Sequence, residues 1–254
     1  MVKKPLYTVA AIIVFIALWW LVAVAADSML LPTPWQTVRA AADVLSSHYS
    51  WQHIGVTFYR VFLGGVIGSV AGALMGIATR YNRLAETAVR SVIYPLFQSV
   101  PIIIWPMIFV IWFGLGSAAP VLTIAVAVAP FFIINIWEGI KEMDANLVEM
   151  ATTYTHRKDR ILGKVILPML YPYLFTALRG SSITAWRVVI LGEIFGSASG
   201  IGYLLWMAFE NYRIDEVFAW TFIFAAIIIT FDYGIYNYID RKYIRRWKYQ
   251  QEKS

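Results

Sequence analysis

Residues 6–26, LYTVAAIIVFIALWWLVAVAA, form an unbroken run without a charged side chain. A helix that crosses a bilayer needs about 20 mostly apolar residues, so this run predicts a membrane-spanning helix. Ala23-Val24-Ala25 also resembles a cleavage site for a secretory signal, but the apolar part of such signals runs only about 7–15 residues. We therefore expect an uncleaved N-terminal helix and an integral membrane protein.

The composition of the whole chain agrees with a membrane protein. Of the 254 residues, 60% are hydrophobic and 14% are charged, whereas soluble domains carry roughly 25% charged residues. Cysteine is absent, which excludes disulfides and thiolate metal sites. The three histidines are scattered without ligand spacing, so we expect no metal site, no catalytic residues and no cofactor in this chain.

Five further apolar stretches predict an all-α integral membrane protein with six transmembrane helices in a single domain, residues 1–254. A connector near Thr33-Pro34 has the pattern of a capped helix start; whether that helix lies on the membrane surface or packs as a connector stays open. We expect a core bundle over about 54–239 and a basic tail over 240–254. The expected spans after the first are 56–78, 89–113 (interrupted by Pro95 and Pro101), 121–137, 169–195 and 217–239.

Charge fixes the expected orientation. Most of the 21 lysines and arginines gather near the termini and after spans two and four, and Lys and Arg are enriched in cytoplasmic loops. Both termini are therefore expected in the cytoplasm, with Arg39, Arg60 and Arg213 on the outer side. This distribution explains the net charge of +6 without nucleic acid.

The second span carries glycine at every fourth position: Gly64, Gly68, Gly72 and Gly76. Glycine is unfavourable inside a helix, and small residues on one face allow two helices to approach closely. The pattern predicts a tight helix–helix contact, either within this chain or with another.

The polar segment over about 138–168 lies between spans four and five, on the expected cytoplasmic side. Asp144 can cap a first short helix, residues 155–158 break it, and a second apolar pattern ends at Leu167-Pro168. Two amphipathic helices in water favour a groove of another protein as their partner; the alternative is that they rest on lipid headgroups. The apolar faces comprise Leu147, Met150, Ala151 and Tyr154 in the first helix, and Ile161, Leu162, Val165 and Ile166 in the second.

This segment resembles the coupling-loop signature of bacterial ABC importer permeases. Glu149, Ala151 and the Leu167-Pro168 pair match that signature in type and spacing, whereas Met150 replaces its middle residue and Thr155 stands where glycine is usual. Glycine there would permit a sharp turn, so Thr155 predicts an altered coupling geometry. The stretches LLPTPWQT (30–37), IWFGLG (111–116), ALRGS (177–181) and SASGIGYLLW (197–206) are similar to the nitrate/sulfonate/taurine branch of the family.

The resemblance implies a multi-pass protein of the bacterial plasma membrane that pairs with a second copy of itself or with a paralogue. It also implies two cytoplasmic ATP-binding subunits, which would hold ATP and Mg, and an extracytoplasmic solute-binding protein. The coupling contacts would come from Glu149, Met150, Ala151, Thr155, Leu167 and Pro168. The implied cargo is a small oxyanion or sulfonate such as nitrate, taurine, an alkanesulfonate or bicarbonate, with a thiamine precursor, flavin or aromatic acid as the alternative.

Two other classes are less favoured. The sequence contains no GxxxxGK[ST] phosphate loop, so ATP hydrolysis by that mechanism must belong to a separate subunit and the chain itself is not expected to be an enzyme. An ion-coupled secondary carrier would be expected to show inverted repeats, and a membrane-embedded enzyme would need a paired catalytic constellation. Neither pattern is clear in this sequence.

Charged residues inside a membrane need a specific reason. We expect Arg187 in the fifth span to face a central path and favour anions; alternatively, it pairs with a carboxylate on another helix. Glu193 lies six residues away on a different face, so the two are not expected to pair. Trp186 is a candidate for lining an aromatic cavity, and Gly200-Ile201-Gly202 is expected to form a turn.

Overall fold

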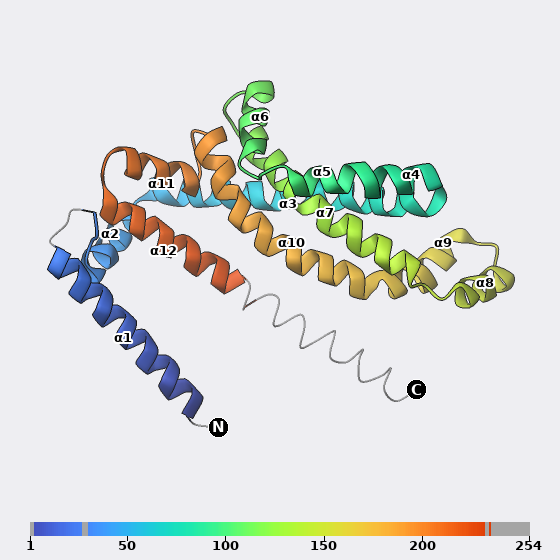
Figure 1. Cartoon of the computed structure of the whole chain (residues 1–254), viewed down its shortest axis with the longest axis horizontal. Helices are drawn as coiled ribbons and strands as arrows, with labels where there is room; N and C mark the ends of the chain where they lie inside the picture. The colour runs from blue at the N-terminus through green and yellow to red at the C-terminus, as the bar shows by residue number, and fades with distance from the viewer. Residues whose placement is uncertain (1–2, 27–29, 232–233, 235–254) are drawn as a thin grey trace.

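The computed structural model describes residues 3–26, 30–231 and 234. Every secondary-structure element in that part of the chain is a helix, as the sequence predicts (Figure 1). The elements are α1 (Lys3–Ala26), α2 (Pro34–Ser46), α3 (His48–Tyr81), α4 (Arg83–Ala88), η1 (Val89–Ile93), α5 (Tyr94–Ser99), α6 (Ile104–Phe113), α7 (Ala118–Lys141), α8 (Ala145–Tyr154), α9 (Lys158–Ile161), η2 (Leu162–Ile166), α10 (Leu167–Gly196), α11 (Ile201–Glu210) and α12 (Ile214–Phe231).

Five helical stretches are long and apolar enough to cross a membrane, or up to six if one bent pair counts as a span. They correspond to the expected first, second, fourth, fifth and sixth spans. The expected basic tail, and the sixth span beyond Phe231 apart from residue 234, lie outside the described residues. The five stretches are Tyr7–Ala26, His48–Arg80, Ala118–Lys141, Leu162–Gly196 and Ile214–Phe231.

The third span differs from the expected one over 89–113. Its two parts, Arg83–Ser99 and Ile104–Phe113, meet at 96°, so α6 turns away from α5 (Figure 1). Val100 has an extended backbone, with φ −77° and ψ 120°. The ring of Pro101 disfavours the helical conformation in the preceding residue, which explains why the helix stops there.

The core is formed by α3, α7 and α10, and the glycines of α3 allow the first two to touch. A Cβ atom on Gly68 would lie 2.5 Å from the carbonyl oxygen of Ala125, and one on Gly72 would lie 2.4 Å from that of Ala129. A Cβ atom on Gly64 would lie 2.7 Å from Ile124 Cβ, and one on Gly76 would lie 3.0 Å from Ile136 Cβ, both on α7. The partner of the glycine face is therefore a helix of the same chain.

Two segments of π-helix, η1 and η2, occur where a proline follows. Each segment ends two residues before its proline, Pro95 or Pro168. The N–H of the residue that follows each segment donates to the carbonyl oxygen five residues earlier: Tyr94 to Val89, and Leu167 to Leu162. A proline ring clashes with the carbonyl four residues earlier, and in both cases that carbonyl lies within the wide π turn. The helix therefore continues through each proline instead of ending.

The two ends of the bundle carry different connectors. The helices α2 and α11 lie at one end, and α8 and α9 lie at the other (Figure 1). Thr33 caps α2 through a capping box with Gln36, as the sequence predicts. This helix packs on α12 and buries Thr37 and Ala40, so it is a packed connector. By contrast, α1 points away from the bundle and is almost entirely exposed.

Candidate functional site

The helix α8 at one end of the bundle is built as the sequence predicts. The Asp144 carboxylate accepts a hydrogen bond from the Asn146 N–H at 2.9 Å and caps the first turn. Thr155 ends the helix in an extended conformation, with φ −153° and ψ 136°. Because any residue adopts that conformation, glycine is not required here, and the Thr155 hydroxyl accepts the Arg157 N–H at 3.3 Å to close the turn.

The apolar face of α8 remains largely uncovered by the rest of the chain. Leu147 is 44% exposed, Met150 is 57% exposed and Tyr154 is 89% exposed. Within the described part of the chain, α8 packs mainly against its sequence neighbours α9 and η2. Exposed apolar residues gathered on one face are typical of an interaction surface.

The second half of this segment departs from the prediction. The second apolar pattern was expected to end at Leu167-Pro168, but the helix, which begins at Lys158, runs through η2 directly into α10. The wide turn of η2 accommodates the Pro168 ring, which is the physical reason for the difference. Leu167 is exposed and Pro168 lies in the first turn of α10. Glu149 is exposed on α8, and Ala151 and Thr155 are half-buried.

A second cluster of polar residues lies buried near the α11 end of the bundle. The Arg60 guanidinium forms an ion pair with Glu193 at 3.0 Å, and the two side chains are 1% and 0% exposed. Arg60 was expected on the outer side, and it lies near the α11 end of the bundle; its burial and its pairing with Glu193 were not foreseen. A signal was present in the sequence, since Arg60 precedes Gly64 by four residues and therefore lies on the glycine face of α3.

Arg60 joins the linker between α6 and α7 to the linker between α10 and α11. Its guanidinium donates to Ser117 Oγ at 3.1–3.2 Å, to Ser197 Oγ at 2.7 Å, and to the carbonyl and hydroxyl of Ser199 at 2.6 and 2.7 Å. The Gly116 N–H also donates to the Gly196 carbonyl at 3.0 Å. The α6–α7 and α10–α11 linkers are thus held against α3 as one unit.

Glu193 holds the start of α11. It accepts hydrogen bonds from the Thr57 hydroxyl and from the Gly202 N–H, both at 2.9 Å. A Cβ atom on Gly200 would lie 2.2 Å from Glu193 Cδ, and one on Gly202 would lie 2.8 Å from Glu193 Cβ. Gly200 also has φ +104°. The expected turn at 200–202 is therefore wrong: only Gly200 turns, and Ile201 already begins a helix.

The comparison with known families decides what this arrangement of helices is. Residues 68–245 match the model of the family described as "Binding-protein-dependent transport system inner membrane component". The chain belongs to this family. It is a permease of the ABC importer type, as the resemblance of its coupling segment implies.

Several relatives of the permease have names that include a cargo. It is 29% identical over 216 residues to the putative aliphatic sulfonates transport permease protein SsuC of Bacillus subtilis, covering 84% of this chain and 78% of the relative. It is 24% identical to the taurine transport system permease protein TauC of Escherichia coli, in a match that covers 92% of this chain and 87% of the relative. A bicarbonate transport permease, CmpB of Synechococcus elongatus, is 31% identical, covering 66% and 61%.

A solved structure has the same fold. The permease resembles a chain of the MetNI methionine ABC transporter in an inward-facing conformation, with a TM-score of 0.53 and 22% sequence identity. The match covers 82% of this chain and 98% of that one.

The three residues expected to line a path do not lie together in the permease. Glu193 is enclosed by the Arg60 cluster, and Trp186 is 3% exposed among Phe58, Phe224 and Phe231. Neither side chain is accessible to a solute in this conformation, because this chain's own helices surround both. Arg187 is exposed on α10, so it remains a candidate for contact with cargo. Among the described residues, no group of three or more His, Cys, Asp or Glu side chains has the arrangement of a metal site.

Proposed function

We propose that this permease is driven by two separate cytoplasmic ATPase subunits and that it imports a small oxyanion or sulfonate. The observation that carries the proposal is the uncovered apolar face of α8. An amphipathic helix with an exposed apolar face fits the groove of a partner protein. Glu149 would lie at that contact, with Met150, Ala151 and Thr155 beside it and Leu167 and Pro168 at the base of α10.

The proposed assembly follows from the family and the distribution of charge. Two copies of the chain would enclose the path, with α8 and α9 in the cytoplasm and α2 and α11 on the outer side, where a solute-binding protein would deliver cargo. Both termini would then be cytoplasmic and the membrane would be the bacterial plasma membrane. The Lys and Arg residues near α4, α8 and α9 support this orientation.

The proposed cargo rests on the named cargoes of relatives. Aliphatic sulfonates, taurine and bicarbonate are small anions or carry an anionic group, and they recur among the similar permeases. A second candidate is a thiamine precursor, because the chain is 28% identical over 202 residues to the formylaminopyrimidine transport permease protein ThiX of Halalkalibacterium halodurans. Aromatic cargo would suit a chain that contains 11 tryptophans.

Reconstitution tests both the coupling and the cargo. The chain would be placed in proteoliposomes with the ATPase and binding protein encoded beside it, and ATP hydrolysis measured with nitrate, taurine, butanesulfonate, bicarbonate and formylaminopyrimidine. We expect one anion to stimulate hydrolysis and Glu149→Lys to abolish the stimulation, since a reversed charge at the proposed interface would repel the groove that accepts Glu149.

The matched control is Glu149→Asp, which keeps the negative charge at the same exposed position of α8. It should leave stimulation unchanged. Full stimulation in the Glu149→Lys protein would contradict the proposed coupling contact. Stimulation by formylaminopyrimidine alone would replace the proposed cargo with the second candidate.

A further inference from the structure

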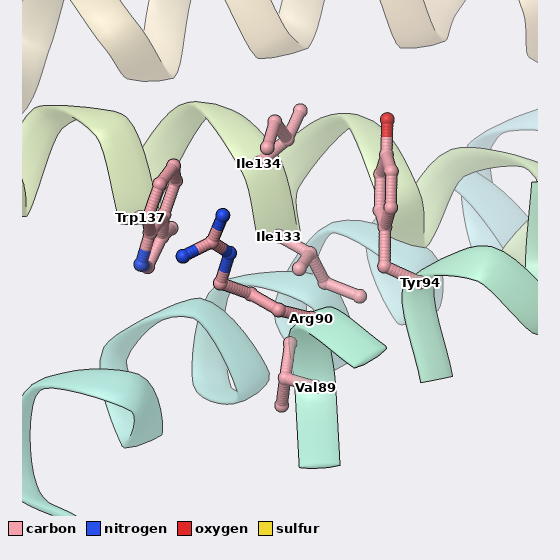
Figure 2. Close-up of a pocket in the computed structure, with 6 residues that line it drawn as sticks. All are labelled: Val89, Arg90, Tyr94, Ile133, Ile134 and Trp137. Atoms are coloured by element: carbon pink, nitrogen blue, oxygen red, sulfur yellow. The ribbon is translucent and has the colours of Figure 1, made fainter. Parts of the chain in front are cut away.

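A pocket of about 240 Å³ opens between η1, the start of α5 and the C-terminal half of α7. Figure 2 shows its lining, with the Arg90 side chain extending past Ile133 toward Trp137 and the Tyr94 ring standing on the far side. None of these residues takes part in the α8 surface or in the Arg60 cluster. The lining residues are Val89, Arg90, Tyr94, Ile133, Ile134 and Trp137.

The backbone of η1 gives this pocket its shape. Arg90 belongs to the π turn that precedes Pro95, and Tyr94 follows that turn directly. Residues four apart lie on one face of a helix, so Ile133 and Trp137 form the facing wall from α7. π turns inside helices occur frequently at functional sites, and this one brings a cation and a phenol to the edge of an apolar cavity.

The cation in the pocket retains free hydrogen-bond donors. The Arg90 guanidinium carbon lies 4.3 Å from the centre of the Trp137 ring, and Lys141 Nζ lies 5.3 Å from it. The Glu86 carboxylate forms an ion pair with Arg90 at 3.8 Å, a separation too long for a hydrogen bond, and it accepts the Trp137 indole N–H at 3.3 Å. Over the described residues, no acceptor lies within hydrogen-bond reach of the Arg90 guanidinium.

A guanidinium fixed on an aromatic face, with its planar edge free, suits recognition of an oxyanion by two parallel hydrogen bonds. The remaining walls from Val89, Ile133 and Ile134 are apolar and suit a short hydrocarbon group. The ligand chemistry that matches both parts is an amphiphilic anion: a sulfonate, carboxylate or phosphate head on an apolar tail.

We propose that this pocket binds such an anion, with its head on Arg90 and Tyr94 and its tail against Ile133 and Ile134. The identification of that anion with transported cargo rests on the proposed function. In the proposed orientation the pocket lies in the cytoplasmic half, near Lys141, where α7 ends, so an imported sulfonate would meet it shortly before release. A lipid phosphate with its acyl chain has the same chemistry and is the other source of such an anion.

Calorimetric titration of the full chain in phosphatidylcholine nanodiscs tests the site, with butanesulfonate and inorganic sulfate as probes. We expect butanesulfonate to bind more tightly than sulfate and Arg90→Gln to weaken it about tenfold or more, because a hydrogen bond to a charged group contributes about 1.5–3 kcal/mol. Arg83→Gln removes the same charge from an exposed position of α4, outside the pocket, and should bind as the unmodified protein does. Equal affinity in the Arg90→Gln protein would overturn the proposal.

Ile134→Trp gives an independent measure, because it fills the apolar wall without changing charge. It should weaken butanesulfonate more than sulfate; equal effects on the two probes would contradict the proposed tail contact. Repeating the titration in phosphatidylglycerol nanodiscs separates the two sources of anion. If butanesulfonate binding is lost in phosphatidylglycerol nanodiscs, and Arg90→Gln then has no further effect, the pocket is assigned to lipid. If butanesulfonate binds equally well in both kinds of nanodisc, the pocket is assigned to a soluble anion.

Comparing ATP hydrolysis by the reconstituted importer with the binding measurements separates this proposal from the proposed function. If a sulfonate stimulates ATP hydrolysis but Arg90→Gln does not change butanesulfonate binding, the proposed function is retained and the pocket is rejected. Arg90-dependent binding without stimulation by any anion would retain the pocket and reject anion import.

Discussion

Arg60 and Glu193 show how much a single pair of side chains can organise. A charge is costly in the interior of a membrane protein unless it is paired and hydrogen-bonded, and here the guanidinium is bonded to Glu193 and to three serines from two linkers. The pair therefore positions the α6–α7 and α10–α11 linkers against α3, and Gly200 fits closely against the Glu193 carboxylate.

Breaking this pair should be strongly destabilising. Arg60→Met leaves the Glu193 carboxylate buried without its counterion, a change that costs about 3–5 kcal/mol in comparable buried pairs. We expect a large fall in the thermal unfolding temperature of the detergent-solubilised chain, and partial recovery in the Arg60→Met/Glu193→Gln double variant. Arg213→Gln, which breaks the half-exposed pair with Glu216, should cost about 1 kcal/mol or less. Equal losses from Arg60→Met and Arg213→Gln would show that burial of the pair has no special role.

At the scale of elements, the fold depends on how closely α3 and α7 approach. The four glycines put the α3 backbone against the carbonyl oxygens and side chains of α7. Without a large hydrophobic gain on association in lipid, such close packing is a main source of helix–helix stability. The neighbouring Gly65 has no atom within 4 Å of where a Cβ would stand, so it does not share this role.

Gly72→Ala and Gly65→Ala form a matched pair that tests this packing. Both add one methyl group to α3, but only the first would meet the Ala129 carbonyl oxygen, at 2.4 Å. We expect Gly72→Ala to destabilise the chain by about 1–3 kcal/mol through overpacking. Gly65→Ala should be neutral or stabilising by up to about 1 kcal/mol, from helix propensity. Unfolding temperatures in one detergent measure both, and indistinguishable values would rule out the α3–α7 contact.

At the scale of the whole molecule, the two ends of the bundle have different roles. The helices α8 and α9 lie at one end and α2 and α11 at the other (Figure 1). The α8–α9 end presents an exposed apolar helix and most of the loop cations, whereas the α2–α11 end is held together internally by the Arg60 cluster. This polarity is what an importer needs if the motor acts on one side and cargo arrives on the other.

The absence of cysteine from the sequence makes the orientation directly testable. We expect Glu210→Cys, on α11, to react with a membrane-impermeant maleimide in intact cells, because it would lie on the outer side. Tyr154→Cys, on the exposed face of α8, should react only after the membrane is opened. The unmodified chain is the blank. The reverse pattern of labelling would invert the proposed topology.

The sequence predicts the helices well because the signals are local. Apolar length identifies five spans, Thr33 and Asp144 mark two helix starts, and the four-residue spacing of glycine identifies the packing face of α3. These features depend on neighbouring residues or on one helix face. The family likewise follows from a contiguous segment around Glu149.

Features that depend on contacts between distant residues required the tertiary structure. Arg60 and Glu193 are 133 residues apart, and no local pattern specifies that they meet or that Trp186 turns inward. The 96° bend after α5 and the passage of η2 into α10 also depend on packing and on how each proline is accommodated. The sequence by itself thus determined five of the spans, the caps of α2 and α8, and the family. Only the tertiary structure decided which buried charges pair and where a pocket opens, because those outcomes follow from the relative placement of whole helices.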